Sequence, residues 1–273
     1  MLSKLTKYEL MGTGRVLLPM YGALLILGVV VRLFTGNGNS EALQMPQWLE
    51  LMSVLSVMAY TAVMVAVFVL TFIVLVQRFY KNLLGDEGYL MFTLPVPTWK
   101  LVISKMLAAL LWCVVSMAVA VLSGFLIVVN GAFFSELGDV LRVLISMLND
   151  INVWKVLWLC FSLLIMMLAI GAGEVLNLYA AMAVGHIFHR HKLLWSFGVY
   201  LIMQMVSVWV VDIIGTVLGY SGFVDAVVRW GESLYRIDAA IVAVWGMTAF
   251  ALVGAVVYFV ITQLALNRKL NLE

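Results

Sequence analysis

Long uncharged apolar runs constrain this chain more than any other feature. Residues 51–77, for example, contain no Asp, Glu, Lys or Arg, and similar stretches recur along the sequence. A helix that crosses a bilayer needs about 20 apolar residues, whereas the strands of a transmembrane barrel alternate apolar and polar residues over about 10 positions. These runs are continuous, so we expect an all-α integral membrane protein.

The composition agrees with this expectation. Of the 273 residues, 65% are hydrophobic and 11% are charged, whereas soluble domains carry about 25% charged residues. We treat residues 1–273 as a single transmembrane domain. The six predicted spans are residues 16–34, 51–77, 102–130, 153–178, 193–211 and 239–265.

The basic residues predict the orientation of these spans. If the N-terminus is cytoplasmic, eleven of the sixteen Lys and Arg residues fall in cytoplasmic segments or at cytoplasmic helix ends. Cytoplasmic loops of membrane proteins carry an excess of Lys and Arg, so we expect both termini in the cytoplasm. The net charge of only +2 gives no support for nucleic-acid binding.

The N-terminal residues 1–15 are expected to form an interfacial helix. They place apolar residues at helical spacing with lysines on the other side, a pattern typical of a helix that lies in the membrane plane. Gly12 and Gly14 would let the chain turn into the first span.

A second non-spanning segment is predicted between spans five and six. Residues 213–228, "IIGTVLGYSGFVDAVV", are apolar but interrupted by glycines and by Asp225. A seventh span here would put Arg268 and Lys269 outside, against the charge rule. We therefore expect a re-entrant or interfacial segment, whose backbone must be covered by protein or border a water-filled cavity.

The longest polar interruption is the stretch "RFYKNLLGDEGYLMFTLPVPTWKLVISK", residues 78–105. Gly85 is expected to end an extension of span two, and Thr98 to cap span three. Between them, an acidic pair suits the first turn of a short helix, and Pro95 and Pro97 stop that helix. Its aromatic and apolar side chains predict an exposed patch that binds a partner; the alternative is that the patch lies on the lipid interface.

Motifs for nucleotide or hydrolytic chemistry are missing from the sequence. No G-x-x-x-x-G-K-[ST] phosphate loop or H-E-x-x-H motif occurs. His186, His189 and His191 could supply imidazoles to zinc, but a basic cytoplasmic turn explains them as well. Glu174 is an ionisable group within an apolar run and hence a functional candidate, or else a solvated glutamate near the membrane surface.

The two cysteines lie inside apolar runs. For Cys113 and Cys160 we expect buried reduced thiols rather than a disulfide.

Three motifs resemble those of ABC-2-type ABC transporter permeases, the small six-span subunits of Gram-positive, especially clostridial-type, bacteria. They are "KYEL" with Arg15, "GDEGYLMFTLPVPTWKLVISK" after span two, and "AAMAVGHIFHRHK" between spans four and five. The resemblance in topology covers nearly the whole chain. It implies a multi-pass protein of the bacterial cytoplasmic membrane.

The resemblance also implies a coupling helix between spans two and three that docks into a separate ATP-binding subunit. ATP and Mg would belong to that subunit, so this chain would hold no cofactor and perform no catalysis. A second permease subunit, identical or related, would complete the transporter, with a lean toward export. The residues that would contact the ATP-binding subunit are Asp86, Glu87, Gly88, Tyr89, Leu90, Phe92 and Leu94.

Two other functions are open at this point. One is a membrane-embedded metal-dependent hydrolase, which would need Glu174 and the three histidines at one depth. The other is an anchor or immunity protein that binds a toxin without transporting it.

Overall fold

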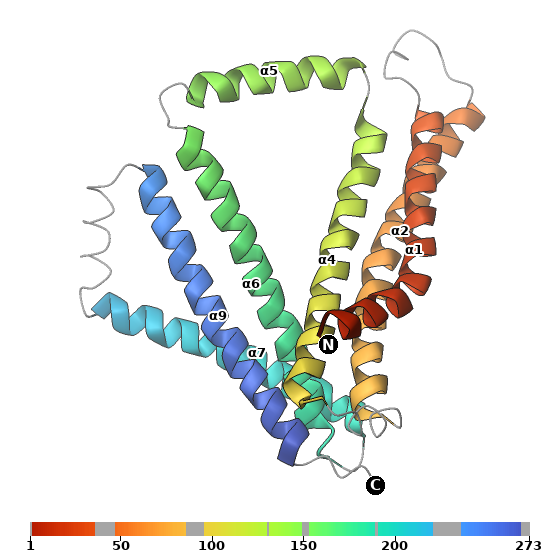
Figure 1. Cartoon of the computed structure of the whole chain (residues 1–273). Coiled ribbons are helices and arrows are strands. Elements are labelled where there is room, and N and C mark those ends of the chain that lie inside the picture. The colour runs from red at the N-terminus through yellow and green to blue at the C-terminus, as the bar shows by residue number, and fades with distance from the viewer. Residues whose placement is uncertain are drawn as a thin grey trace. The chain divides into compact units, whose positions relative to one another are not determined.

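The computed structural model describes residues 2–35, 47–85, 96–129, 131–148, 153–188, 191–220 and 236–268, and these ranges form seven α-helices and one π-helical turn (Figure 1). The elements are α1 (Leu2–Thr35), α2 (Gln47–Phe79), η2 (Tyr80–Leu84), α4 (Thr98–Val128), α5 (Gly131–Leu148), α6 (Val153–Gly185), α7 (Lys192–Tyr220) and α9 (Arg236–Arg268).

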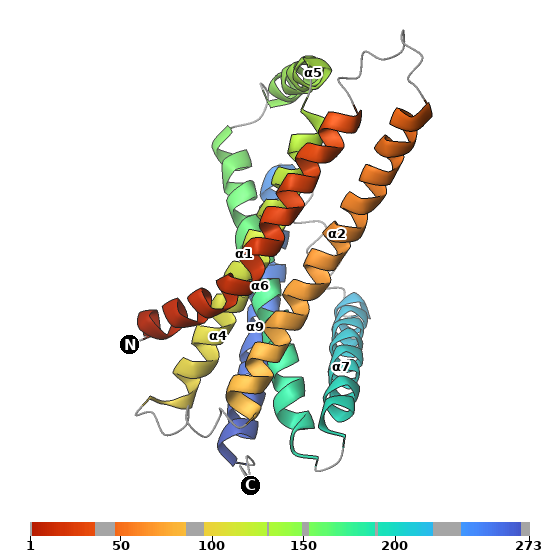
Figure 2. The ribbon, with the colours of Figure 1, turned by 90° about the vertical axis from the view of Figure 1, so that its right-hand side faces the viewer.

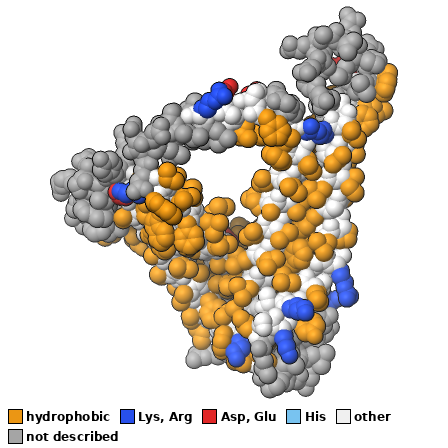
Figure 3. Space-filling view, turned by 45° about the horizontal axis from the view of Figure 1, so that its top comes forward, with side chains coloured by type: hydrophobic (Ala, Val, Ile, Leu, Met, Phe, Trp, Pro, Cys, Tyr) orange, Lys and Arg blue, Asp and Glu red, His pale blue; other side chains and the backbone are white. Residues whose placement is uncertain are grey.

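Six of these helices are long and apolar enough to cross a membrane, which confirms the six predicted spans. The chain is thus a multi-pass helical membrane protein. Each helix is longer than the run that predicted it; α6, with 33 residues, is about 50 Å long at 1.5 Å per residue. Since the hydrocarbon layer is about 30 Å thick, the helix ends reach into the polar layers. On the face shown in Figure 3, hydrophobic side chains cover the sides of the helices.

The chain forms two compact units. Unit 1 contains residues 1–78 and 107–150, and unit 2 contains residues 79–106 and 151–273. The helices α2 and α4 therefore each pass from one unit into the other near the loop that joins them.

The core of unit 1 is built from α1, α2 and α4. Its buried members are Leu17, Tyr21, Leu24, Val31, Tyr60, Val67 and Trp112. Hydroxyl pairs join the helices inside this core: Tyr21 with Thr71, 3.3 Å apart, and Tyr60 with Ser123, 2.9 Å apart. Gly28 permits a close approach of α1 to α4, because a Cβ atom there would lie 3.3 Å from the Ser123 carbonyl oxygen.

The predicted interfacial helix and first span form one continuous helix. The N-terminal part of α1 runs at a steep angle to the rest (Figure 2). Gly12, Gly14 and Pro19 lie within α1, and glycine and proline are usual causes of helix bends. A 34-residue helix is about 51 Å long, which leaves its first turns free to lie outside the hydrocarbon.

Helix α5 was not predicted. It lies within unit 1 and runs across the end of α4 (Figure 1). The sequence places Phe134, Leu137 and Leu141 at helical spacing, and Ser135, Asp139 and Arg142 at the complementary positions. This period-3.6 pattern is typical of an amphipathic helix. Its signal was present in the sequence but lay in a segment expected to be only a loop.

Unit 2 is built around α6. Helix α6 packs along α9, and α7 also packs against α6. Residues 213–220 continue α7 instead of starting a separate segment; a Cβ atom on Gly215 would meet no atom within 4 Å. The rest of the predicted re-entrant segment, residues 221–228, lies outside the described residues.

The cysteine prediction was half right. Both Cys113 and Cys160 are free thiols, but both are exposed on their helices. A cysteine on a membrane helix can face lipid without meeting water, so an apolar run does not by itself place the side chain inside the protein.

Candidate functional site

The base of the loop after α2 is anchored on the end of α6. The Phe79 ring stacks on the Tyr179 ring with centroids 3.7 Å apart. The next residue, Tyr80, meets the His186 ring edge-on at 5.6 Å. Leu83 and Leu84 are buried. The first half of the loop base therefore packs within unit 2, to which residues 79–84 belong, whereas the preceding residues of α2 belong to unit 1.

The helix changes geometry at this base. Residues Tyr80–Leu84 form the π-helical turn η2, which ends when the Gly85 N–H donates to the Tyr80 carbonyl at 2.9 Å. This confirms that Gly85 ends the extension of span two. Single π-helical turns are rare and often occur at functional sites.

The other side of the loop is anchored on α9. The Thr98 hydroxyl lies 2.8 Å from Gln263 Oε1 and 3.0 Å from Asn267 Oδ1. A hydroxyl has one proton, so it donates to one of these amide oxygens at a time. The prediction that Thr98 caps α4 was wrong: it is the first helical residue, and its side chain binds a neighbouring helix. Leu101, Val102 and Ser104 follow as buried residues.

The predicted partner-binding residues lie outside the described residues. Asp86, Glu87, Gly88, Tyr89, Leu90, Phe92 and Leu94 all belong to the range 86–95. The structure describes the residues on either side of this segment, up to residue 85 and from residue 96. Both ends are held by unit 2, the first by α6 and the second by α9.

A buried ion pair joins the N-terminal part of α1 to the end of α2. Arg78 Nε donates to Glu9 Oε2 at 3.0 Å, and its Nη1 donates to Thr13 Oγ1 at 2.8 Å. A Cβ atom on Gly12 would overlap the Arg78 guanidinium, so a larger residue there would have to displace this side chain from its position beside Glu9. Glu9 is only 8% exposed. No sequence pattern predicts this pair, because its members are 69 residues apart.

A cavity of about 560 Å³ lies between α6, α7 and α9, all within unit 2. Its walls are mostly apolar. Glu174 on α6 accepts a hydrogen bond at 3.0 Å from Gln204 Nε2 on α7, and Gln204 also lies 3.2 Å from the Tyr200 hydroxyl. Farther along α7, the Ser207 hydroxyl pairs with the Tyr258 hydroxyl of α9. The cavity thus carries a short polar row.

The histidines do not form a metal site with Glu174. His186 follows Glu174 by twelve positions, about 18 Å of helix rise. Within the described ranges, no three His, Cys, Asp or Glu side chains come close enough to hold a metal ion; His189 lies outside those ranges. Burial, and then the charge of Lys192, lower the pKa of His186 below its ordinary value, which favours a neutral imidazole at pH 7.

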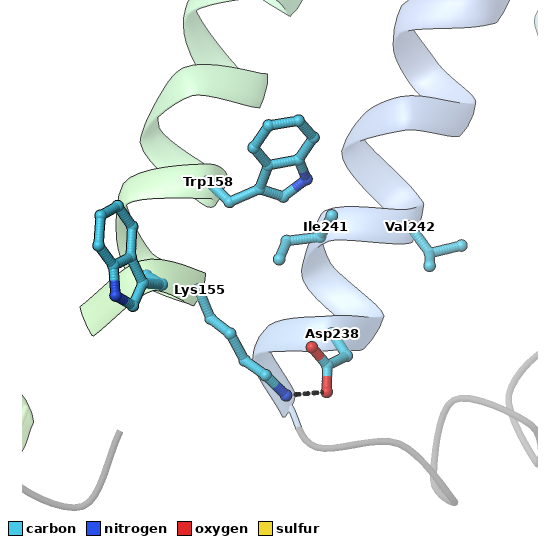
Figure 4. Close-up of a pocket in the computed structure, with 6 residues that line it drawn as sticks. Lys155, Trp158, Asp238, Ile241 and Val242 are labelled. Carbon is cyan, nitrogen blue, oxygen red and sulfur yellow. Dashed lines mark hydrogen bonds and ion pairs between the residues drawn. The ribbon is translucent and has the colours of Figure 1, made fainter. Parts of the chain in front are cut away.

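The opposite ends of α6 and α9 are joined by a second ion pair. Lys155 Nζ lies 2.6 Å from Asp238 Oδ2, beside Trp158 and a shallow pocket lined also by Ile241 and Val242 (Figure 4). This pair joins the starts of α6 and α9, whereas the loop base lies at their far ends. The two helices therefore run in the same direction.

Comparison with protein-family models found no match, and neither did comparison with curated proteins or with solved structures. The fold and the site define the class of protein, a helical multi-pass membrane protein with six candidate spans.

Proposed function

We propose that this chain is the permease subunit of an ATP-driven ABC transporter of the ABC-2 type, acting as an exporter in the bacterial cytoplasmic membrane. A separate ATP-binding subunit, with ATP and Mg, would supply the energy. Residues 86–94 would form the coupling helix that docks into this subunit. A second permease subunit, identical or related, would complete the translocation path.

The observation that carries this proposal is the anchoring of the loop base. A coupling helix can transmit a displacement to the membrane spans only if both ends of the helix are attached to those spans. Phe79 is stacked on Tyr179 of α6, and Thr98 is hydrogen-bonded to Gln263 of α9. A displacement of residues 86–94 would therefore move α6 and α9, which border the cavity of unit 2.

The excess of Lys and Arg supports the same orientation. The residues expected in the cytoplasm include those at the loop base, in the turn after α6 and at the end of α9. Contacts bring these segments together at one end of unit 2: Tyr80 with His186, and Thr98 with Asn267. A cytoplasmic ATP-binding subunit would need them there.

The two alternatives have less support. A metal hydrolase built on Glu174 and the histidines needs these groups at one depth, and Glu174 lies about 18 Å along the helix from His186. A non-transporting anchor or immunity protein would have no need for a loop fixed on both sides to spans that border a cavity.

The test is co-purification of an ATP-binding subunit with the chain in mild detergent. Aromatic anchors commonly contribute about 2 kcal/mol or more of binding each, so Tyr89→Ala with Phe92→Ala should weaken association at least about 30-fold. Phe134→Ala is the control, because it removes an aromatic side chain that is 60% exposed on α5. Undiminished co-purification of the double variant would overturn the proposal.

A second arm tests the anchoring itself. Thr98→Val keeps residues 86–94 and removes the bond to α9. We expect the ATP-binding subunit to bind this variant normally, while the substrate-stimulated part of its ATP hydrolysis falls. If stimulation is unchanged, the contact with α9 does not transmit the movement.

A further inference from the structure

We propose that the cavity between α6, α7 and α9 is a binding site for a free amphiphilic organic cation: a drug-sized molecule with an apolar or aromatic body and one positive charge. This inference deepens the proposed function by naming a substrate class. That the bound cation is also transported rests on the proposed function.

The size and walls of the cavity fit such a ligand. Sites for drug-sized molecules enclose about 300–1,000 Å³ and are mostly apolar with a few placed polar groups; this cavity measures about 560 Å³. Phe250 and Tyr258 on α9 add aromatic faces to the wall, and aromatic rings attract cations.

The charged groups of the cavity wall favour a ligand that carries a positive charge. Glu174 lines it, and the cavity wall described here contains no Lys, Arg or His. The hydrogen bond from Gln204 orients the carboxylate but brings no positive charge. A carboxylate is costly inside a membrane unless it is paired. Glu174 lies eleven positions before the end of α6, about 16 Å, so the compensating charge is best supplied by the occupant.

The charge of the cavity wall also disfavours membrane lipids as the occupant. The headgroup of phosphatidylethanolamine carries an amine, but also a phosphate that would lie near Glu174. No basic side chain among the residues lining the cavity would compensate that phosphate. A cation without an acidic group avoids this repulsion.

The test uses two probes of the same shape and opposite charge. The full chain, alone in phosphatidylcholine nanodiscs, is titrated with radiolabelled tetraphenylphosphonium and, separately, with tetraphenylborate. After the binding to empty nanodiscs is subtracted, we expect saturable binding of the cation and weaker saturable binding of the anion. Glu174→Gln should weaken cation binding at least about tenfold, which corresponds to about 1.4 kcal/mol, without weakening binding of the anion. Glu50→Gln, at the exposed start of α2, should change neither.

A cavity-filling variant keeps the test decisive if Glu174→Gln does not fold. A Cβ atom on Gly254, which lines the cavity, would meet open space within 4 Å, and so would one on Gly215, which does not line it. Gly254→Phe should abolish binding of the cation, and Gly215→Phe should leave it intact.

Three results would overturn the inference: equal binding of both probes, no effect of Gly254→Phe, or displacement of the cation by phosphatidylethanolamine, which would identify a lipid as the occupant. No ATP or partner is present in this test. A failure here therefore leaves the permease proposal standing, whereas a failure of co-purification does not affect cation binding.

Discussion

The two units of this chain use the same kinds of helix and pack them differently. In unit 1, Leu17 and Leu24 are fully buried, and Trp112 lies beside Tyr21 with ring centroids 6.1 Å apart. In unit 2, α7 contributes a span of which none of the apolar window is buried, and α6, α7 and α9 surround a cavity.

Under the proposed function, this difference would correspond to a division of roles between the two units. Helices in lipid associate by close packing and interhelical hydrogen bonds, because lipid tails are as apolar as the side chains. Unit 1 has both, and we expect it to be the rigid part. In unit 2, interhelical hydrogen bonds join the helices that surround the cavity. Residues of unit 2 also hold both ends of the loop 86–95. Under the proposed function, the cavity of unit 2 would be the binding part, and the loop ends held by unit 2 would be the moving part.

The largest effect should come from removing one aromatic side chain in each unit. Trp112→Ala would leave a cavity in the core of unit 1 and lower the free energy of unfolding by about 3 kcal/mol. Phe250→Ala, at a wall residue that is 47% exposed, should cost less than about 1 kcal/mol, because lipid or ligand already meets that side chain. Unfolding in a detergent titration measures both. Equal losses would mean that the cavity wall at Phe250 is packed as tightly as the core of unit 1.

The next effect concerns the ion pair between α1 and α2. Arg78→Ala would leave Glu9 buried without the partner that lies at 3.0 Å. Breaking a buried pair costs about 3–5 kcal/mol, and partial exposure of the guanidinium reduces our expectation to about 2 kcal/mol.

Arg142→Ala is the matched control for that experiment. It breaks the ion pair with Asp139 on α5, in which both side chains are largely exposed, and should change stability by less than about 0.5 kcal/mol. The measurement is the same detergent titration. If both arginine variants lose the same small amount of unfolding free energy, the burial of Glu9 does not strengthen its ion pair with Arg78.

The smallest effect distinguishes two interhelical hydroxyl pairs. Ser123→Ala leaves the Tyr60 hydroxyl buried in unit 1 without this partner, at a cost of about 1 kcal/mol. Ser207→Ala removes a half-buried bond to the Tyr258 hydroxyl beside the cavity. This bond is less completely enclosed by protein, so we expect about 0.5 kcal/mol. The reverse order in thermal unfolding would contradict the expectation that a hydrogen bond beside the cavity contributes less than one in the core of unit 1.

Sequence reasoning succeeded where local chemistry decides the structure. The six spans follow from the length and composition of apolar runs, and the end of η2 at Gly85 follows from the glycine. It failed where a side chain has a choice of partners. Thr98 was expected to cap its own helix and instead binds Gln263 of α9. The amphipathic α5 was missed although its spacing was visible.

By itself the sequence determined that the chain is an α-helical membrane protein, because a bilayer demands helices of a given length and apolarity. Only the tertiary structure decided which residues meet. The pair of Glu9 with Arg78 and the cavity holding Glu174 and Gln204 each join residues far apart in the chain. Such contacts depend on how the helices pack against one another. The sequence does not reveal this packing, because the side of a membrane helix that faces lipid is as apolar as the side that faces protein.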